Sequence, residues 1–137
     1  MPSTLAISPS RAADYRQCPL MYRLKAIDKL PVPRTEAQVK GTLVHAVLEE
    51  MFAWPRAERT FPAAVKQLRP SWARMQEQDA ACAEPIADEM QLLIDARELL
   101  RGYFYMESPL GFDAHAQEMC VEAVLPNGVP VRGFIDR

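Results

Sequence analysis

The sequence predicts an α/β or α+β domain in which helices come first and one β-hairpin comes last. Apolar residues recur at helical spacing through most of residues 36–105, and apolar and polar residues then alternate over 115–125 and 129–135. Asn127-Gly128 separates the two alternating segments, and this dipeptide is the strongest short signal for a hairpin turn. Because an isolated two-stranded hairpin is only marginally stable, we expect the sheet to need strands that these residues do not contain.

Three long helices are expected before the hairpin, at residues 36–53, 61–78 and 85–105. Thr35 is the expected cap of the first, which carries a broad apolar stripe at helical spacing. Pro70 lies inside the second and should kink or split it, because proline has no N–H to donate to the preceding turn. The third shows the clearest helical period of the three.

Residues 1–34 form a basic N-terminal arm ahead of residues 35–137, the remainder of the domain. Ser8-Pro9 is typical of a helix start, and the closing Leu-Pro-Val-Pro run favours an extended linker. Residues 1–40 hold seven Lys or Arg against three acids, whereas the remainder holds nine against fifteen. The arm interleaves guanidinium groups with aromatic rings, which favours contact with single-stranded DNA, at Arg11, Arg16, Tyr22 and Arg23. A solvated basic helix face explains the charge equally well.

Composition narrows the class of protein. With 137 residues, 49% apolar and 25% charged, the chain has the size and balance of one globular domain. It has no apolar run near the roughly 18 residues that span a bilayer and no secretory signal, so we expect a cytoplasmic protein. Cys18, Cys82 and Cys120 are odd in number and widely spaced, which argues against a disulfide framework or a self-contained zinc site. We expect Cys82 and Cys120 to be small buried apolar residues.

Two residues could carry chemistry. Asp136 ends an apolar strand, where a carboxylate is well placed to bind a hard divalent ion, or simply to make a turn or a salt bridge. His45 shares one helix face with Gly41 and Glu49. Its imidazole could ligate a metal or orient a phosphate with Glu49 holding it, or it could be an ordinary surface histidine paired with that glutamate.

A two-residue turn at Asn127-Gly128 would pair Val124 with Val131 and Met119 with Asp136. In that register Glu118 and Glu122 face the side opposite Asp136, and Glu118 lies across from Arg137. We therefore expect a structural ion pair at Glu118 and no metal ligand there. If the strand register shifted by one residue, Glu118 and Glu122 would instead lie on the same face of the hairpin as Asp136.

Three blocks of sequence, taken in order, resemble the RecB-family exonucleases of the PD-(D/E)XK nuclease superfamily, related to the nuclease domains of RecB and AddB. Residues 5–31 resemble the start of these domains. Residues 41–49, GTLVHAVLE, are similar to the family's G-x-x-x-H-x-x-L-E helix. Residues 133–137, GFIDR, are similar to its G-x-I-D-R strand. The resemblance implies a restriction-endonuclease-like α/β fold and exonuclease activity on DNA that depends on Mg²⁺ or Mn²⁺. It also implies that the substrate is the end of a single DNA strand, that the protein acts in repair or recombination, and that a helicase is its partner.

The resemblance also assigns roles to residues. Asp136 becomes the first metal-binding carboxylate and His45 the helix-borne metal or active-site histidine. Cys18, in its Cys-Pro-Leu context, is similar to the N-terminal ligand of the 4Fe–4S cluster in the iron–sulfur branch of the family. The family continues into a D-Y-K-T-G-like strand, a Gln-Tyr helix and three further cysteines, which these 137 residues do not contain. We therefore expect an N-terminal part, the helices plus the first β-hairpin, that is inactive alone.

Two alternatives remain open. The chain could be a non-catalytic DNA-binding module in which the basic arm binds and Asp136 is a turn residue. It could also be a helical interaction protein whose hairpin adds to the sheet of a partner through an unpaired edge.

Overall fold

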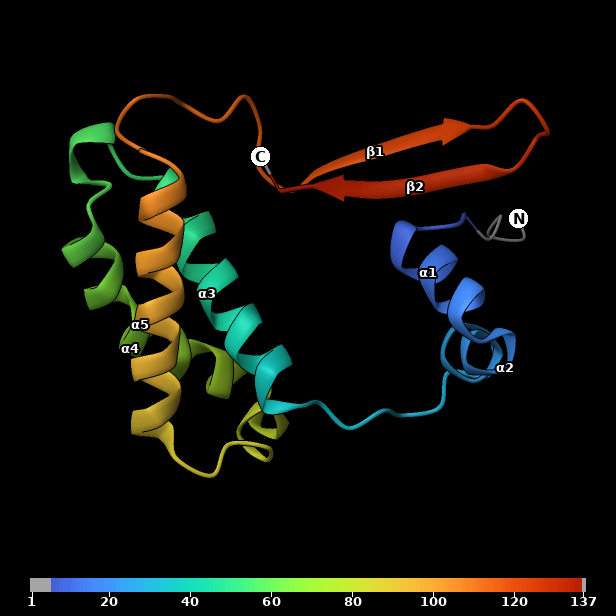
Figure 1. Ribbon diagram of the computed structural model, residues 1–137, viewed down its shortest axis with the longest axis horizontal. Coiled ribbons are helices and arrows are strands. Elements are labelled where there is room, and N and C mark those ends of the chain that lie inside the picture. Colours follow the sequence, from blue (N-terminus) through green and yellow to red (C-terminus); the bar gives the residue numbers. More distant parts are fainter. Residues whose placement is uncertain (1–5, 137) are drawn as a thin grey trace. The chain divides into compact units, whose positions relative to one another are not determined.

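A computed structural model describes residues 6–136 of the chain, which divides into two compact units (Figure 1). The helical unit comprises residues 34–114. The hairpin unit comprises, in its described part, residues 6–33 and 115–136. The predicted fold class is confirmed, because helices are followed by one antiparallel hairpin. Among the described residues, no helix has the length and apolarity needed to cross a membrane.

The helical unit contains three long helices joined by short 3-10 turns. They are α3 (Glu36–Phe52), α4 (Phe61–Gln78) and α5 (Glu89–Met106), with η2 (Arg56–Glu58) and η3 (Ala80–Ala83) in the connections. The first two lie close to the ranges expected from sequence. The third begins at Glu89, four residues later than expected, because the Asp88 carboxylate caps it by accepting from the Gln91 N–H at 3.1 Å.

Local side-chain chemistry also sets the start and the course of the other two helices. Thr35 and Gln38 form a reciprocal capping box: the Thr35 hydroxyl accepts from the Gln38 N–H at 3.2 Å, and the Gln38 side chain accepts from the Thr35 N–H at 2.9 Å. The predicted cap at Thr35 is therefore confirmed. Pro70 lies inside α4 without splitting it into two helices.

The hydrophobic core lies entirely within the helical unit, since every buried residue of the described chain belongs to it. The broad apolar stripe of α3 supplies Leu43, Val47 and Met51, each fully buried. It packs against Leu68 and Trp72 of α4 and against Leu92 and Leu100 of α5. Burial of these large apolar side chains is the main source of stability for the helical unit.

An ion pair ties α3 to α5 beside this core and makes the stability of the unit depend on pH. The Lys40 ammonium donates to Asp95 at 2.8 Å, which holds the pKa of the Asp95 carboxyl below its ordinary value, with a smaller contribution from Gln91. The pKa of Lys40 is raised in turn, chiefly by the same hydrogen bond. The folded-state pKa of Asp95 lies below the unfolded value of about 3.9. Its contribution is therefore present above about pH 4 and is lost as the pH falls through the folded-state pKa.

We accordingly expect Asp95→Asn to be less stable than the parent chain near neutral pH and to match it in strong acid. Urea unfolding followed by circular dichroism across the acid range would measure the gap between the two proteins. A gap that stays constant down to about pH 2 would contradict the assigned role, because the protonated carboxyl can no longer pair with Lys40.

The hairpin unit consists of short helices and the hairpin. They are α1 (Pro9–Gln17), α2 (Pro19–Tyr22), a π-helical turn η1 (Arg23–Ile27), β1 (Met119–Val124) and β2 (Pro130–Ile135). The predicted helix start is confirmed, since the Ser8 hydroxyl accepts from the Arg11 N–H at 3.3 Å with Pro9 in the first turn. No described residue of this unit is buried.

The predicted strand register is wrong by one residue. Met119 lies opposite Ile135 and Val124 opposite Pro130, so Met119 does not pair with Asp136 and Val124 does not pair with Val131. The loop has three residues instead of two: the Leu125 N–H donates to the Val129 carbonyl at 2.9 Å. The slip brings Glu118 opposite Asp136, so the predicted separation of these two residues onto opposite faces is also wrong.

The expected ion pair at Glu118 involved Arg137, which lies outside the described residues. Within the described hairpin the ion pair joins Glu122 to Arg132, whose Oε1 and Nε atoms are 3.6 Å apart.

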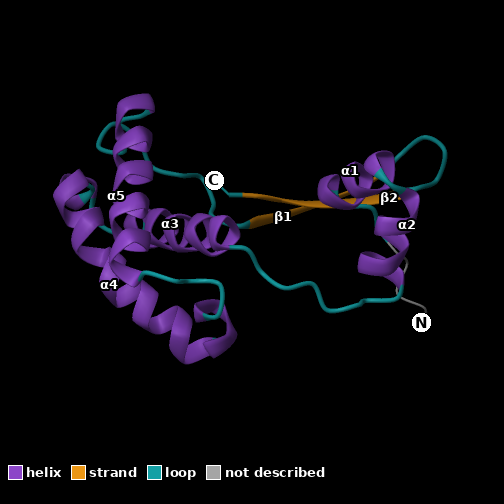
Figure 2. Cartoon of the chain, turned by 60° about the horizontal axis from the view of Figure 1, so that its bottom comes forward, coloured by secondary structure: helices purple, strands orange, loops and turns teal. Residues whose placement is uncertain are grey.

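A residue far away in sequence extends the sheet. Ile7 bridges to Val131 in the parallel sense, with its N–H donating to the Pro130 carbonyl and its carbonyl accepting from the Arg132 N–H, both at 3.0 Å. Figure 2 shows the result, with α1 beginning beside β2. This pairing is why the hairpin groups with the N-terminal arm.

Candidate metal centre and nucleic-acid interface

Asp136 directly follows β2 and its side chain is exposed. Its backbone carbonyl accepts a hydrogen bond from the Glu118 N–H at 3.1 Å, so the two acidic residues lie opposite each other where the strands end. Glu118 has a φ of 49°, which is uncommon for a residue with a side chain. The hairpin thus brings two carboxylate-bearing residues to one place, a pairing that the predicted register had missed.

His45 and Glu49 lie one turn apart on α3, and both are exposed. The α3 residues that enter the core are on another face, with Leu43 and Val47 as the nearest of them. Gly41 is on the same side as His45, and a Cβ built at that position has no described atom within 4 Å other than those of its chain neighbours and its own helix backbone. Packing within this structure therefore does not explain the glycine. His45 belongs to the helical unit and Asp136 to the hairpin unit.

The arm residues expected to contact DNA differ in their local partners. Arg11 is half-buried, and its Nη1 donates to a backbone carbonyl, that of Ala6, at 3.1 Å. Arg23 is exposed and pairs with Asp28 at 3.4 Å. The ring of Tyr22 packs edge-on against that of Tyr15, with centroids 5.5 Å apart, and Tyr15 is 57% exposed. Exposed guanidinium groups are therefore present at Arg16 on α1 and Arg23 on η1, and an exposed phenol at Tyr15 on α1, as contact with a nucleic-acid strand would require.

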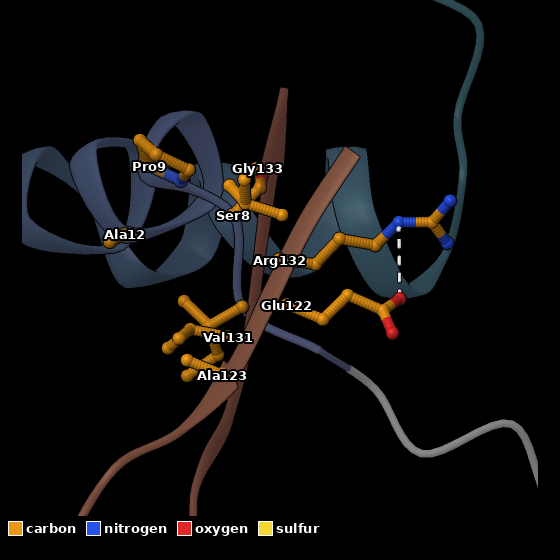
Figure 3. Close-up of a pocket in the computed structure, with 10 residues that line it drawn as sticks. Ser8, Pro9, Ala12, Glu122, Ala123, Val131, Arg132 and Gly133 are labelled. Atoms are coloured by element: carbon orange, nitrogen blue, oxygen red, sulfur yellow. Dashed lines mark ion pairs between the residues drawn. The ribbon is translucent and has the colours of Figure 1, made fainter. Parts of the chain in front are cut away.

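An apolar cavity of about 360 Å³ lies where α1 meets the hairpin (Figure 3). Ile7, Pro9, Val121 and Val131 contribute apolar side chains to its wall. A Cβ added to Gly133 would lie 3.9 Å from Pro9, so α1 and β2 approach closely there. Local periodicity could not have indicated this cavity, because it depends on the pairing of Ile7 with β2.

A model of the PD-(D/E)XK nuclease superfamily matches residues 6–137, nearly the whole chain. The chain belongs to the PD-(D/E)XK nuclease superfamily. Its helices and small antiparallel sheet are consistent with part of that fold. Comparisons with curated proteins and with solved structures gave no match.

Members of the PD-(D/E)XK superfamily act on nucleic acids and use divalent metal ions, and the donor chemistry of this chain fits such an ion. Hard cations such as Mg²⁺ prefer carboxylate oxygens, and the hairpin presents Asp136 at a strand end with Glu118 opposite. Asp136 was identified from its motif, whereas Glu118 could have been found only from the correct register.

The cysteines of this nuclease-superfamily chain do not by themselves fit a 4Fe–4S cluster, which takes four thiolates. The sequence has three cysteines. Cys18 is half-buried, and its sulfur accepts from the Met21 N–H at 3.5 Å as the cap of α2. Cys82 is buried as predicted, and burial raises the pKa of its thiol. The prediction of a buried Cys120 is wrong: it is exposed on β1, and its sulfur lies 3.3 Å from the Nε of Arg132.

Proposed function

We propose that the chain provides part of the catalytic centre of a RecB-like, metal-dependent DNA exonuclease that acts in repair or recombination. Superfamily membership over residues 6–137 carries the proposal, since it implies phosphodiester hydrolysis with a divalent metal. The RecB-like blocks at residues 41–49 and 133–137 favour the exonuclease branch.

Asp136 and His45 have separate roles in this proposal. When bound, Mg²⁺ or Mn²⁺ supplies Lewis-acid stabilisation of the phosphate and lowers the pKa of an attacking water. Asp136 would hold the ion through its carboxylate, because the strand before it limits the freedom of that carboxylate. His45 serves as the active-site histidine, oriented by Glu49 one turn away. One aspartate and one histidine are too few ligands for tight binding of a hard ion, so the site would need further oxygen ligands, from Glu118 or from groups outside this chain.

The substrate in this proposal is single-stranded DNA at an end, delivered by a helicase partner. Arg11, Arg16, Tyr22 and Arg23 contact the strand through phosphates and base faces. Cys18 is the first ligand of a 4Fe–4S cluster only if three more cysteines come from outside these 137 residues. Cys18 is half-buried at the start of α2, where its sulfur is a free thiol, and this is compatible with that role.

Reading the source gene beyond the codon for Arg137 tests the proposal directly. We expect the frame to continue into a strand with a D-x-K or E-x-K motif, which supplies the second carboxylate and a lysine able to orient the attacking water. A late group of three cysteines would establish the iron–sulfur role of Cys18. A stop codon at that point would refute catalysis by this protein.

One observation favours a second candidate, an interaction protein that pairs its hairpin with the sheet of a partner. No residue of the hairpin unit is buried among those the structure describes, and Val124 and Phe134 are 69% and 58% exposed. Exposed apolar strands are typical of a surface that another sheet or helix covers. Co-purification with a single β-rich partner, together with that stop codon, would support this candidate.

A further inference from the structure

Helices α4 and α5 pack together within the helical unit (Figure 1). Side chains of both helices line a groove of about 400 Å³. Val65, Leu93 and Ile94 contribute to its apolar floor, and Ile94 is 47% exposed. Lys66, Arg69 and Arg97 stand among them, and no acidic residue lines the groove. The groove therefore combines an aliphatic surface with three exposed cations from two helices.

Lys66, Arg69 and Arg97 differ from the other cations of the helical unit because those others are paired with carboxylates. The unit, all of which the structure describes, holds nine Lys or Arg against thirteen Asp or Glu. Six of the nine cations are paired with a carboxylate, namely Arg34, Lys40, Arg56, Arg59, Arg74 and Arg101. The remaining three, which have no ion-pair partner among the described residues, are Lys66, Arg69 and Arg97. On a unit with a surplus of acids, the unneutralised cations thus gather in one groove, where they attract a polyanion.

We propose that the groove between α4 and α5 binds the backbone of a single-stranded nucleic acid, as a second contact surface apart from the N-terminal arm. The three cations pair with successive phosphates, and the aliphatic floor holds sugar rings and base faces. A single strand is favoured over a duplex because a duplex hides its base faces in the stack. The proposal rests on the proposed function for the identity of the polyanion, since a nuclease must hold its substrate.

Binding in the absence of metal tests this surface without involving the catalytic centre. The probe is a fluorescein-labelled oligothymidylate of about 16 nucleotides, within the range of single-strand sites, titrated in EDTA and followed by anisotropy. Replacing Lys66, Arg69 and Arg97 together with Gln should weaken binding between about 10-fold and 100-fold near 0.1 M salt. It should also make the slope of log K against log salt shallower by about 2, since each lost phosphate contact on a single strand changes the slope by about 0.7.

Matched variants exclude effects of net charge and of misfolding. Replacing the ion-paired Arg56, Arg74 and Arg101 with Gln removes the same charge from the same unit, and should leave the salt slope unchanged. The substitution Ile94→Lys adds a cation to the floor and should tighten binding about fivefold near 0.1 M salt. A misfolded protein cannot show this gain.

Equal losses for the groove variant and the paired-arginine variant would overturn the proposal, and so would an unchanged affinity in both. Preferential binding of an acidic amphipathic peptide, with the affinity for DNA untouched by the groove variant, would assign the groove to a protein partner instead. Asp136→Asn should bind the oligonucleotide as tightly as the parent chain in EDTA. The groove and the proposed catalytic function can therefore fail independently.

Discussion

Substituting Asp136 with Asn should abolish Mg²⁺-dependent cleavage of single-stranded DNA by the product of the full reading frame, with a loss of roughly 10³-fold or more. A bound ion contributes several kcal/mol to stabilising the phosphate charge in the transition state, and each 1.36 kcal/mol is about a tenfold change in rate. Asparagine keeps the size of the side chain and removes the charge that holds the ion. Release of labelled nucleotides as a function of Mg²⁺ and Mn²⁺ concentration would measure the effect.

Glu122→Gln is the matched control, because it also removes one exposed carboxylate from the same hairpin. Glu122 lies in the interior of β1 and pairs with Arg132, so the variant should keep nearly all of its activity. Equal losses in both variants would show that the hairpin needs its charges for folding and not for metal binding. Full activity of Asp136→Asn would remove Asp136 from the metal centre.

The hairpin illustrates how far local sequence determines structure here. Its existence was predictable, because alternation and Asn127-Gly128 are local signals. Its register was predicted wrongly from Asn127-Gly128 alone, because only Gly128 takes a positive φ, of 82°, whereas the expected two-residue turn needs positive φ at both positions. Pro126 instead sets the first position of a type I turn, closed by the Gly128 N–H donating to the Leu125 carbonyl at 2.8 Å. The triplet Pro126-Asn127-Gly128 is therefore the local signal from which the three-residue loop, and with it the strand register, could have been predicted.

Other features depend on contacts between distant residues, so periodicity alone could not predict them. Ile7 reaches β2 across more than 120 positions of sequence. Only the resemblance to family motifs indicated that Asp136 and His45 belong to a metal site. Their spacing alone was equally compatible with a turn residue at Asp136 and an ordinary surface histidine at His45. The groove cations belong to two helices, and neither helix shows by itself that its cations lack partners.

Arg59→Met should cost the helical unit about 3–5 kcal/mol of unfolding free energy, the largest stability effect that we expect of a charged residue in this chain. Arg59 is only 5% exposed, yet it is fully hydrogen-bonded. Its guanidinium donates to the backbone carbonyls of Trp54 at 2.9 Å, Phe112 at 2.9 Å and Phe52 at 3.2 Å, and to the Asp113 carboxylate at 3.0 Å. Methionine fills similar volume but removes all four of these hydrogen bonds from a nearly buried site.

Arg56→Met provides the control, because Arg56 pairs with the same carboxylate from the solvent side. Its side chain is 52% exposed, and its Nε donates to Asp113 at 2.8 Å. Its hydrogen bond is the largest single cause of the lowered pKa of that carboxyl, but an exposed ion pair adds little to stability because water screens it. Urea unfolding of both variants at neutral pH would compare them. Equal losses would mean that the shared ion pair matters and the carbonyls do not. A much larger loss for Arg59→Met would show that this arginine holds the connection between α3 and α4 against the segment after α5.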